Sequence, residues 1–139
     1  MIRTILLAYD GSESAEDAFV FAMDLARQYN SELHVLAVAR PPDFAEDVET
    51  EAIVEHSRKY YMKALSSLKT RLMKASITAH FEVAVGHPAV QIVRYAEQHE
   101  VDHIIVGHRG HTIFERWLLG SVARQVIAYA HCAVTVVRK

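Results

Sequence analysis

The sequence predicts an α/β protein whose parallel β-sheet lies between two layers of helices. Short, mostly apolar segments alternate along the chain with longer segments in which apolar residues recur every three to four positions. The first apolar segment, residues 2–9, is typical of a central strand that is buried on both faces. Right-handed helical crossovers between parallel strands account for this alternation, so we expect a three-layer domain with five strands.

The chain is expected to form one domain, residues 1–139. No linker, internal repeat or low-complexity segment interrupts the pattern, and a chain of this length can bury a proper core. Apolar residues make up 51% of the chain and charged residues 23%, the balance of a soluble globular protein. The formal net charge of −2 and the scattered basic residues give no electrostatic reason to expect binding to nucleic acid or to an anionic membrane.

The cysteine content and the apolar runs bear on the compartment. Cys132 is the single cysteine, which excludes an internal disulfide and a cysteine-based zinc site. No apolar run approaches the roughly 20 residues that span a bilayer, and the N-terminus lacks the layout of a signal peptide. We therefore expect a cytoplasmic protein.

The first half of the chain predicts two strands, each followed by a helix. Ser14 and Asp17 fit a capping box, and apolar residues then follow at helical spacing, which predicts a helix over residues 12–29. A second apolar run predicts a strand over residues 32–39. Two prolines end that strand, and the acidic residues 43–55 are interpreted as a surface loop that leads into a helix.

The next helix and strand are predicted from an apolar stripe and from strict alternation. Leucines at helical spacing indicate a long helix over residues 48–75. Apolar and polar residues alternate over residues 77–85, which predicts a half-exposed strand towards an edge of the sheet. Pro88 favours the start of a further helix, because proline fits the first helical turn, and that helix ends near residues 99–100.

The last third of the chain predicts a strand over residues 101–106, a helix over residues 121–130 and a final strand over residues 133–138. The final strand has neither proline nor an inward charge, and an edge of this kind tends to pair with another chain. Pairing of this strand with its own copy about a twofold axis predicts a closed homodimer.

The loop after the fourth predicted strand has the composition of an anion-binding loop. Gly107 and Gly110 allow a tight turn and bring main-chain N–H groups close to an anion, because no Cβ is in the way. Gly120 and Ser121 place amide donors, one hydroxyl and the positive end of a helix dipole at a second point on the same ligand. Arg109 can add positive charge. The spacing is neither a Walker A loop, since no lysine follows the last glycine, nor a Gly-x-Gly-x-x-Gly dinucleotide fingerprint.

The full pattern Gly-x2-Gly-x9-Gly-Ser, from Gly107 to Ser121, closely resembles the nucleotide-binding signature of the universal stress protein family, in its ATP-binding branch. Residues 5–12 resemble that family's first strand and its aspartate-bearing turn, and residues 132–138 resemble its closing strand. The resemblance spans essentially the whole chain. It implies a sheet order of 3-2-1-4-5, bound ATP with Mg²⁺, a homodimer through the C-terminal strand, and a role as a stress-response or signalling module.

A sheet of this order makes the first and fourth strands neighbours at the point where the winding reverses, and ligands bind there, beyond the carboxyl ends of the strands. Asp10 and Gly107 lie at those two ends. Asp10 is a short acceptor suited to an adenine amine, a ribose hydroxyl or a metal ion bridging phosphates. Its alternative role is to cap the turn at Gly11 and Ser12, and Ser121 could likewise be only a helix cap.

The resemblance implies that Ala8 and Val38 flank the adenine. His108 stands where the family often has a small hydroxylated residue, and Ala8 stands where some members have proline. The residues implied to bind the nucleotide are Ala8, Tyr9, Asp10, Val38, Val106, Gly107, Arg109, Gly110, Gly120, Ser121 and Val122.

Nine histidines raise the question of a metal site. His108 and His111 are the tightest pair, but no cysteine or carboxylate lies near them at ligand spacing, and a zinc site needs three protein ligands. We therefore expect no metal site. Six other histidines fall on different predicted elements and are expected at the surface or at strand ends: His34, His56, His80, His87, His99 and His103. Trp117, between the two glycine features, has three open roles: a lid, an oligomer contact or packing.

Three functions from different classes remain. The first is an ATP-binding stress-response module whose conformation or partners change with nucleotide binding or slow turnover. The second is an enzyme acting on the α-phosphate of ATP, against which stand the lack of a dedicated nucleophile and of a second carboxylate near Asp10. The third is a nucleotide-free interaction protein, against which the intact glycine pattern argues. Catalysis beyond slow ATP hydrolysis is not expected.

Overall fold

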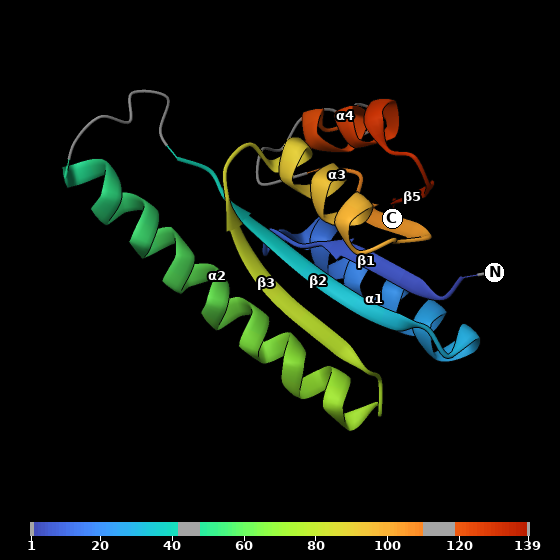
Figure 1. Ribbon diagram of the computed structural model, residues 1–139. Coiled ribbons are helices and arrows are strands. Elements are labelled where there is room, and N and C mark those ends of the chain that lie inside the picture. The colour runs from blue at the N-terminus through green and yellow to red at the C-terminus, as the bar shows by residue number, and fades with distance from the viewer. Residues whose placement is uncertain (1, 42–47, 110–118, 139) are drawn as a thin grey trace.

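The computed structural model describes residues 2–41, 48–109 and 119–138. Its strands form one five-stranded sheet in the order β3-β2-β1-β4-β5, and every neighbouring pair is parallel, which confirms the predicted fold class and order. Strands and helices alternate without exception along the described chain (Figure 1). The elements are β1 Thr4–Ala8, α1 Glu13–Tyr29, β2 Glu32–Ala39, α2 Val48–Lys74, β3 Ala79–Val85, α3 Pro88–Gln98, β4 His103–Gly107, α4 Ser121–Tyr129 and β5 Ala133–Val137.

Helices cover both faces of the sheet, so the domain has three layers (Figure 1). On one face, Phe19 of α1 and Leu68 of α2 are buried in a common core. On the other face, Ile92 of α3 and Val126 of α4 are buried in a second core. The sheet therefore separates two apolar cores, one beneath α1 and α2 and one beneath α3 and α4.

The central strand β1 explains why its sequence is apolar almost throughout. Ile5 and Leu7 belong to the core beneath α1 and α2, whereas Leu6 belongs to the core beneath α3 and α4. All three side chains are fully buried. Because successive side chains of a strand point to opposite faces, a strand covered on both sides has no position for a polar residue.

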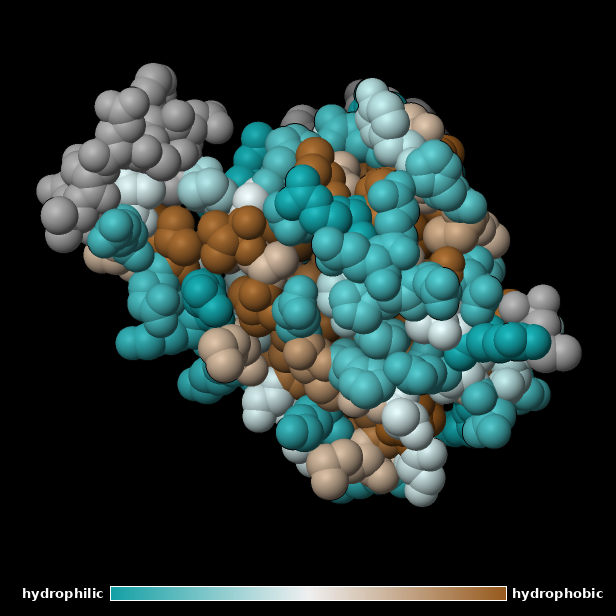
Figure 2. Space-filling view, viewed as in Figure 1, coloured by the Kyte–Doolittle hydropathy of each residue, from teal (hydrophilic) through white to brown (hydrophobic). Residues whose placement is uncertain are grey.

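The strand β3 lies at an edge of the sheet, as its alternating sequence predicted. Phe81 and Val83 pack against the core beneath α1 and α2, while Glu82 between them is exposed. Apolar side chains show through between α2 and α3 along this edge, and Val85 at the end of the strand is 37% exposed (Figure 2). The helix α2 follows the edge and buries Leu68 and Leu72 against it.

The cap of α1 differs from the prediction. The capping box of Ser14 and Asp17 is wrong: the N-cap is Ser12, whose Oγ accepts a hydrogen bond from the N–H of Ala15 at 3.1 Å. Gly11, with φ of +82°, turns the chain directly before this cap, in a conformation that favours glycine. The helix itself begins at Glu13, close to the predicted start at residue 12, and the Ser14 hydroxyl, which does not cap it, contacts Arg109 outside α1.

Within the three described ranges, no helix combines the length and the apolar content needed to cross a membrane.

Candidate functional site

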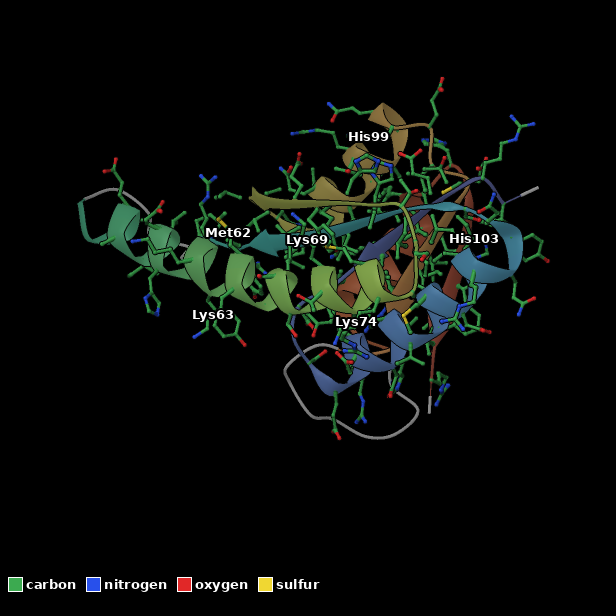
Figure 3. All side chains as sticks on the ribbon, turned by 90° about the horizontal axis from the view of Figure 1, so that it is seen from below. Met62, Lys63, Lys69, Lys74, His99 and His103 are labelled. Carbon is green, nitrogen blue, oxygen red and sulfur yellow. The ribbon has the colours of Figure 1, made fainter. Side chains whose placement is uncertain are left out.

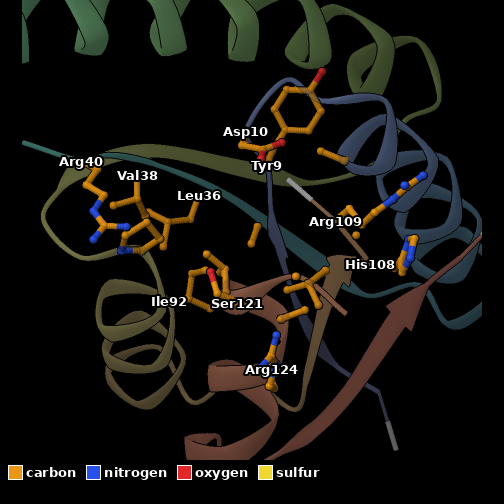
Figure 4. Close-up of a pocket in the computed structure, with 18 of the residues that line it drawn as sticks. Tyr9, Asp10, Leu36, Val38, Arg40, Ile92, His108, Arg109, Ser121 and Arg124 are labelled. Atoms are coloured by element: carbon orange, nitrogen blue, oxygen red, sulfur yellow. The ribbon is translucent and has the colours of Figure 1, made fainter. Parts of the chain in front are cut away.

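A pocket of about 580 Å³ lies where the carboxyl ends of β1, β2 and β4 meet the start of α4 (Figure 4). Ala8 is the last residue of β1 and Gly107 the last of β4, and both line it. These two strands are neighbours, and β2 continues the sheet on one side while β5 continues it on the other. The pocket thus occupies the switch point at which doubly wound sheets bind ligands.

Every predicted binding residue that the structure describes lines this pocket. Gly110 falls outside the described residues, as do His111 and Trp117. The sheet order brings together residues that are almost the full chain apart. The predicted residues on the pocket wall are Ala8, Tyr9, Asp10, Val38, Val106, Gly107, Arg109, Gly120, Ser121 and Val122.

The charged groups on the wall favour an anion. Arg40, Arg109 and Arg124 line the pocket at different points around it (Figure 4). Among the described lining residues, Asp10 is the one carboxylate. A concave site with an excess of fixed positive charge attracts anionic ligands. Two of these arginines were missed, although the sequence carried a signal for each: Arg40 directly follows β2, and Arg124 lies one helical turn after Ser121.

The two halves of the predicted glycine motif are joined by a main-chain hydrogen bond. The N–H of Gly120 donates to the carbonyl of His108 at 2.8 Å, and the N–H of His108 donates to the carbonyl of Val137 at 3.0 Å. The Gly120 amide is therefore engaged within the protein and is not one of the free amide donors that the sequence predicted, although Gly120 lines the pocket. Gly120 is the N-cap of α4, so the interpretation of Ser121 as a cap is also wrong. Ser121 is the first helical residue and is exposed.

No side-chain hydrogen bond caps α4 among the described residues. The first N–H groups of a helix lack intrahelical partners and carry partial positive charge. Ser121 and Val122, the first two residues of α4, both line the pocket. The start of α4 is thus a further element that favours an anion in this pocket.

Gly107 is required for a reason other than the predicted one. A Cβ at this position would lie 2.5 Å from Oγ and 2.7 Å from the carbonyl oxygen of Ser14. Ser14 Oγ in turn accepts a hydrogen bond from the N–H of Arg109 at 3.2 Å. The glycine therefore allows α1 to pack against the end of β4. The prediction, in contrast, was that this glycine makes room for an anion.

Asp10 caps the turn at Gly11 and Ser12, which is the alternative role that the sequence left open for it. Its Oδ1 accepts a hydrogen bond from the N–H of Ser12 at 2.9 Å, which closes the turn at Gly11. The carboxyl group also lines the pocket. A carboxylate has enough acceptor positions for both the turn and a ligand.

The phenol of Tyr9 belongs to a polar cluster between α1 and α2. Its hydroxyl donates to Glu16 at 3.1 Å, and Arg71 of α2 pairs with the same carboxylate. Burial, together with the charge of Glu16, raises the pKa of Tyr9 to about 12 from its ordinary value of 10. Folding therefore favours the protonated phenol.

We expect Tyr9→Phe to reduce the loss of stability at high pH. Stability contributed by a raised pKa is complete below pH 10 and is lost as pH rises from about 10 to about 12. For Tyr9 the loss reaches about 1 kcal/mol by pH 11. Urea unfolding at pH 9 and pH 11 measures it. The control is Tyr29→Phe, which removes an exposed phenol. An equal fall of unfolding free energy in wild type and Tyr9→Phe would contradict the assignment.

Three of the histidines are not dispersed as predicted. His34 of β2, His80 of β3 and His99, which directly follows α3, come together on one face of the sheet. His99 lies on the side of the sheet opposite α2 (Figure 3). His34 is only 6% exposed and lies inside a strand, so its expected place at the surface or at a strand end is wrong. The three histidines are close because two of them lie on neighbouring strands and the third lies at the end of a helix that covers these strands. Their spacing along the sequence does not predict this.

The fold and the pocket together define the class of protein. A doubly wound parallel sheet with an electropositive pocket at its switch point is a Rossmann-like α/β domain suited to an anionic ligand.

The particular family follows from comparison with known proteins. The model of the universal stress protein family matches residues 1–138, and the chain belongs to this family. It is 33% identical, over 142 residues, to a universal stress protein of Methanocaldococcus jannaschii, covering 100% of this chain and 84% of the relative.

Solved structures agree on the fold. Universal stress protein UspA from Lactobacillus plantarum superposes with a TM-score of 0.92 at 25% identity, covering 98% of this chain and 97% of that one. A universal stress protein in complex with cAMP superposes with a TM-score of 0.71 at 24% identity, covering 97% and 96% of the two chains.

Proposed function

We propose that the pocket binds an adenine nucleotide, ATP together with Mg²⁺, and that binding changes the conformation or partners of the protein in a stress response. The observation that carries the proposal is the division of one pocket into an apolar part and a cationic part. Its volume of about 580 Å³ falls within the range of small-molecule sites. The complex of a related fold with cAMP supports the same class of ligand.

The apolar part suits the base. Leu36 and Val38 of β2 and Ile92 of α3 line the pocket there (Figure 4), and Ala8 at the end of β1 lines it as well. Leu36 and Ile92 are almost completely buried in the core beneath α3 and α4. A flat aromatic base gains from contact with such a surface, because its faces are poorly hydrated.

The cationic part suits the phosphates. Arg124 lies in the first turn of α4, where Ser121 adds a hydroxyl and main-chain donors, and Arg109 lines the pocket after the end of β4. Arginine presents several donors in a planar fork that matches phosphate oxygens. Asp10 is the protein carboxylate that would bind Mg²⁺, and the ion would neutralise part of the phosphate charge. No second carboxylate accompanies Asp10 on the described wall, so the pocket favours binding over catalysis.

Calorimetric titration tests this proposal. ATP, with and without Mg²⁺, is titrated into protein that has been shown to be free of co-purified nucleotide, and adenosine is titrated in parallel. We expect micromolar binding of ATP and weaker binding of adenosine, because only ATP reaches the cationic part. Absence of ATP binding would refute the nucleotide function and would favour the nucleotide-free interaction protein.

We further propose a homodimer through β5. This strand pairs with β4 on one side and forms an edge of the sheet on the other. The carbonyl of Val137 accepts from His108, so in a parallel ladder the main-chain groups of Val136 point to the free edge. That edge carries unpaired donors and acceptors that a second copy can satisfy.

Val136→Pro is expected to give a monomer. Proline removes an edge-facing N–H and leaves the ladder to β4 intact. Size-exclusion chromatography with light scattering at micromolar concentration measures the change, and circular dichroism checks the fold. A wild-type monomer would refute the dimer, and a dimer that survives the substitution would place the interface away from β5.

A further inference from the structure

We propose that Glu32, His34 and His80 form a binding site for a divalent transition metal ion such as Zn²⁺. The site lies at the amino ends of β2 and β3, whereas the nucleotide pocket lies at the carboxyl ends of the strands. One ligand atom from each of the three side chains falls within 4.8 Å of the others. The three residues have no metal-binding spacing in the sequence, and none of them lines the nucleotide pocket.

The sheet register creates the juxtaposition. His34 of β2 pairs with His80 of β3 in the parallel ladder, and Glu32 lies two residues before His34. Residues paired in register, or two apart on one strand, point to the same face of a sheet. That face is the one covered by α3, since His34 contacts Tyr95 of α3. The three side chains are therefore held together by the backbone of two hydrogen-bonded strands.

The contacts have nearly the spacing that a metal ion requires. Glu32 Oε1 lies 3.0 Å from Nε2 of His34 and 2.8 Å from Nε2 of His80. In a tetrahedral zinc site with bonds of about 2.0–2.1 Å, neighbouring ligand atoms are roughly 3.3 Å apart. The carboxylate oxygen and each nitrogen would thus move apart by only a few tenths of an ångström, and the ligand nitrogens of the two histidines lie within 4.8 Å of each other. Two imidazoles and one carboxylate are a donor set that zinc accepts, with a fourth position left for water.

His34 is supported from behind in the way that metal-binding histidines usually are. Its second ring nitrogen, Nδ1, lies 2.6 Å from the hydroxyl of Tyr95. The Tyr95 ring stacks on His99 at a centroid distance of 3.8 Å, which fixes the tyrosine in turn. A hydrogen bond to the nitrogen that does not bind the metal orients the imidazole and selects its tautomer. With the metal on Nε2, the proton resides on Nδ1 and is donated to the Tyr95 oxygen.

The exposure of the three ligands suits an ion that enters from solvent. His34 is buried, whereas the side chains of Glu32 and His80 are 46% and 52% exposed. The two exposed ligands give access, and the buried one gives a fixed position.

Titration of Zn²⁺ into untagged, chelator-treated protein tests the site. We expect saturable binding of one ion per chain, and an affinity at least tenfold weaker in Glu32→Gln and in His80→Gln, because each removes one of three ligands. Both residues are substantially exposed, so these variants retain the fold. The control is His131→Gln, whose exposed imidazole pairs with the single carboxylate of Glu97 at 3.2 Å. It is expected to keep the wild-type affinity.

A spectroscopic readout separates a metal site from a plain hydrogen-bond network. On adding Zn²⁺, nitrogen NMR of His34 should show Nε2 shifting as a metal ligand, with the proton on Nδ1. A wild type without a saturable site, or equal losses of affinity in Glu32→Gln and His131→Gln, would overturn the proposal. So would an unchanged His34 spectrum at saturating Zn²⁺.

Discussion

Replacing Gly107 by alanine is expected to destabilise the domain by about 3 kcal/mol, the upper end of the usual cost of overpacking. The added Cβ would lie 2.5 Å from Oγ and 2.7 Å from the carbonyl oxygen of Ser14. The hydroxyl can rotate away, but the carbonyl belongs to the backbone of α1 and can only move with the helix. Moving α1 disturbs its contact with β4 and the hydrogen bond from Arg109 to Ser14.

Thermal unfolding measures this effect, and a fall of about 10 °C in Tm is expected for a domain of this size. The control is Gly120→Ser, at φ of −62° and ψ of 154°, a backbone conformation that serine adopts readily at an N-cap. It should leave Tm nearly unchanged. If Gly107→Ala kept the wild-type Tm but lost nucleotide binding, the glycine would serve the ligand, and our structural account of it would be wrong.

Ser121→Glu is expected to weaken ATP binding on the order of 100-fold, or about 2.7 kcal/mol. Ser121 begins α4 and lines the pocket beside Arg124. A carboxylate there repels the phosphates and competes with them for the arginines and the helix N-terminus. The fold should tolerate the change, because Ser121 is exposed and an acidic residue in the first turn of a helix is stabilising.

Two controls isolate the charge effect. Ser121→Gln has the same shape without the charge and should lose far less affinity than Ser121→Glu. Adenosine, which carries no phosphate, should bind both variants about equally. If Ser121→Glu bound ATP as tightly as Ser121→Gln, the phosphates would lie away from the start of α4, and the orientation that we propose for the nucleotide would be refuted.

The pattern of elements could be predicted from the sequence because it depends on neighbours along the chain. Residues 2–9 carry the apolar run of a strand buried on both faces, and residues 77–85 carry the alternation of an edge strand, and the structure places each where its pattern indicated. The cap of the first helix was predicted less accurately. The helix cap was assigned to Ser14 when it is Ser12, since the turn at Gly11 decides where the helix begins.

The predicted binding residues line one pocket because they stand at strand ends, and the carboxyl ends of parallel strands share one edge of the sheet. The reasons for individual residues could not be predicted in the same way. Gly107 and Ser14 are 93 positions apart in the sequence, and no local pattern reports that they touch. Arg40 was not predicted because it follows β2, far in the sequence from the glycine motif of residues 107–121.

The sequence by itself determined the α/β class, the order of helices and strands, and the turns that carry the glycines. These follow from hydrophobic periodicity and from backbone preferences, which act over a few residues. Only the tertiary structure decided that α1 excludes a side chain at position 107, that arginines from three distant parts of the chain share one pocket, and that Glu32, His34 and His80 meet. Such proximities depend on strand register and helix packing, which bring together atoms whose separation along the chain carries no signal.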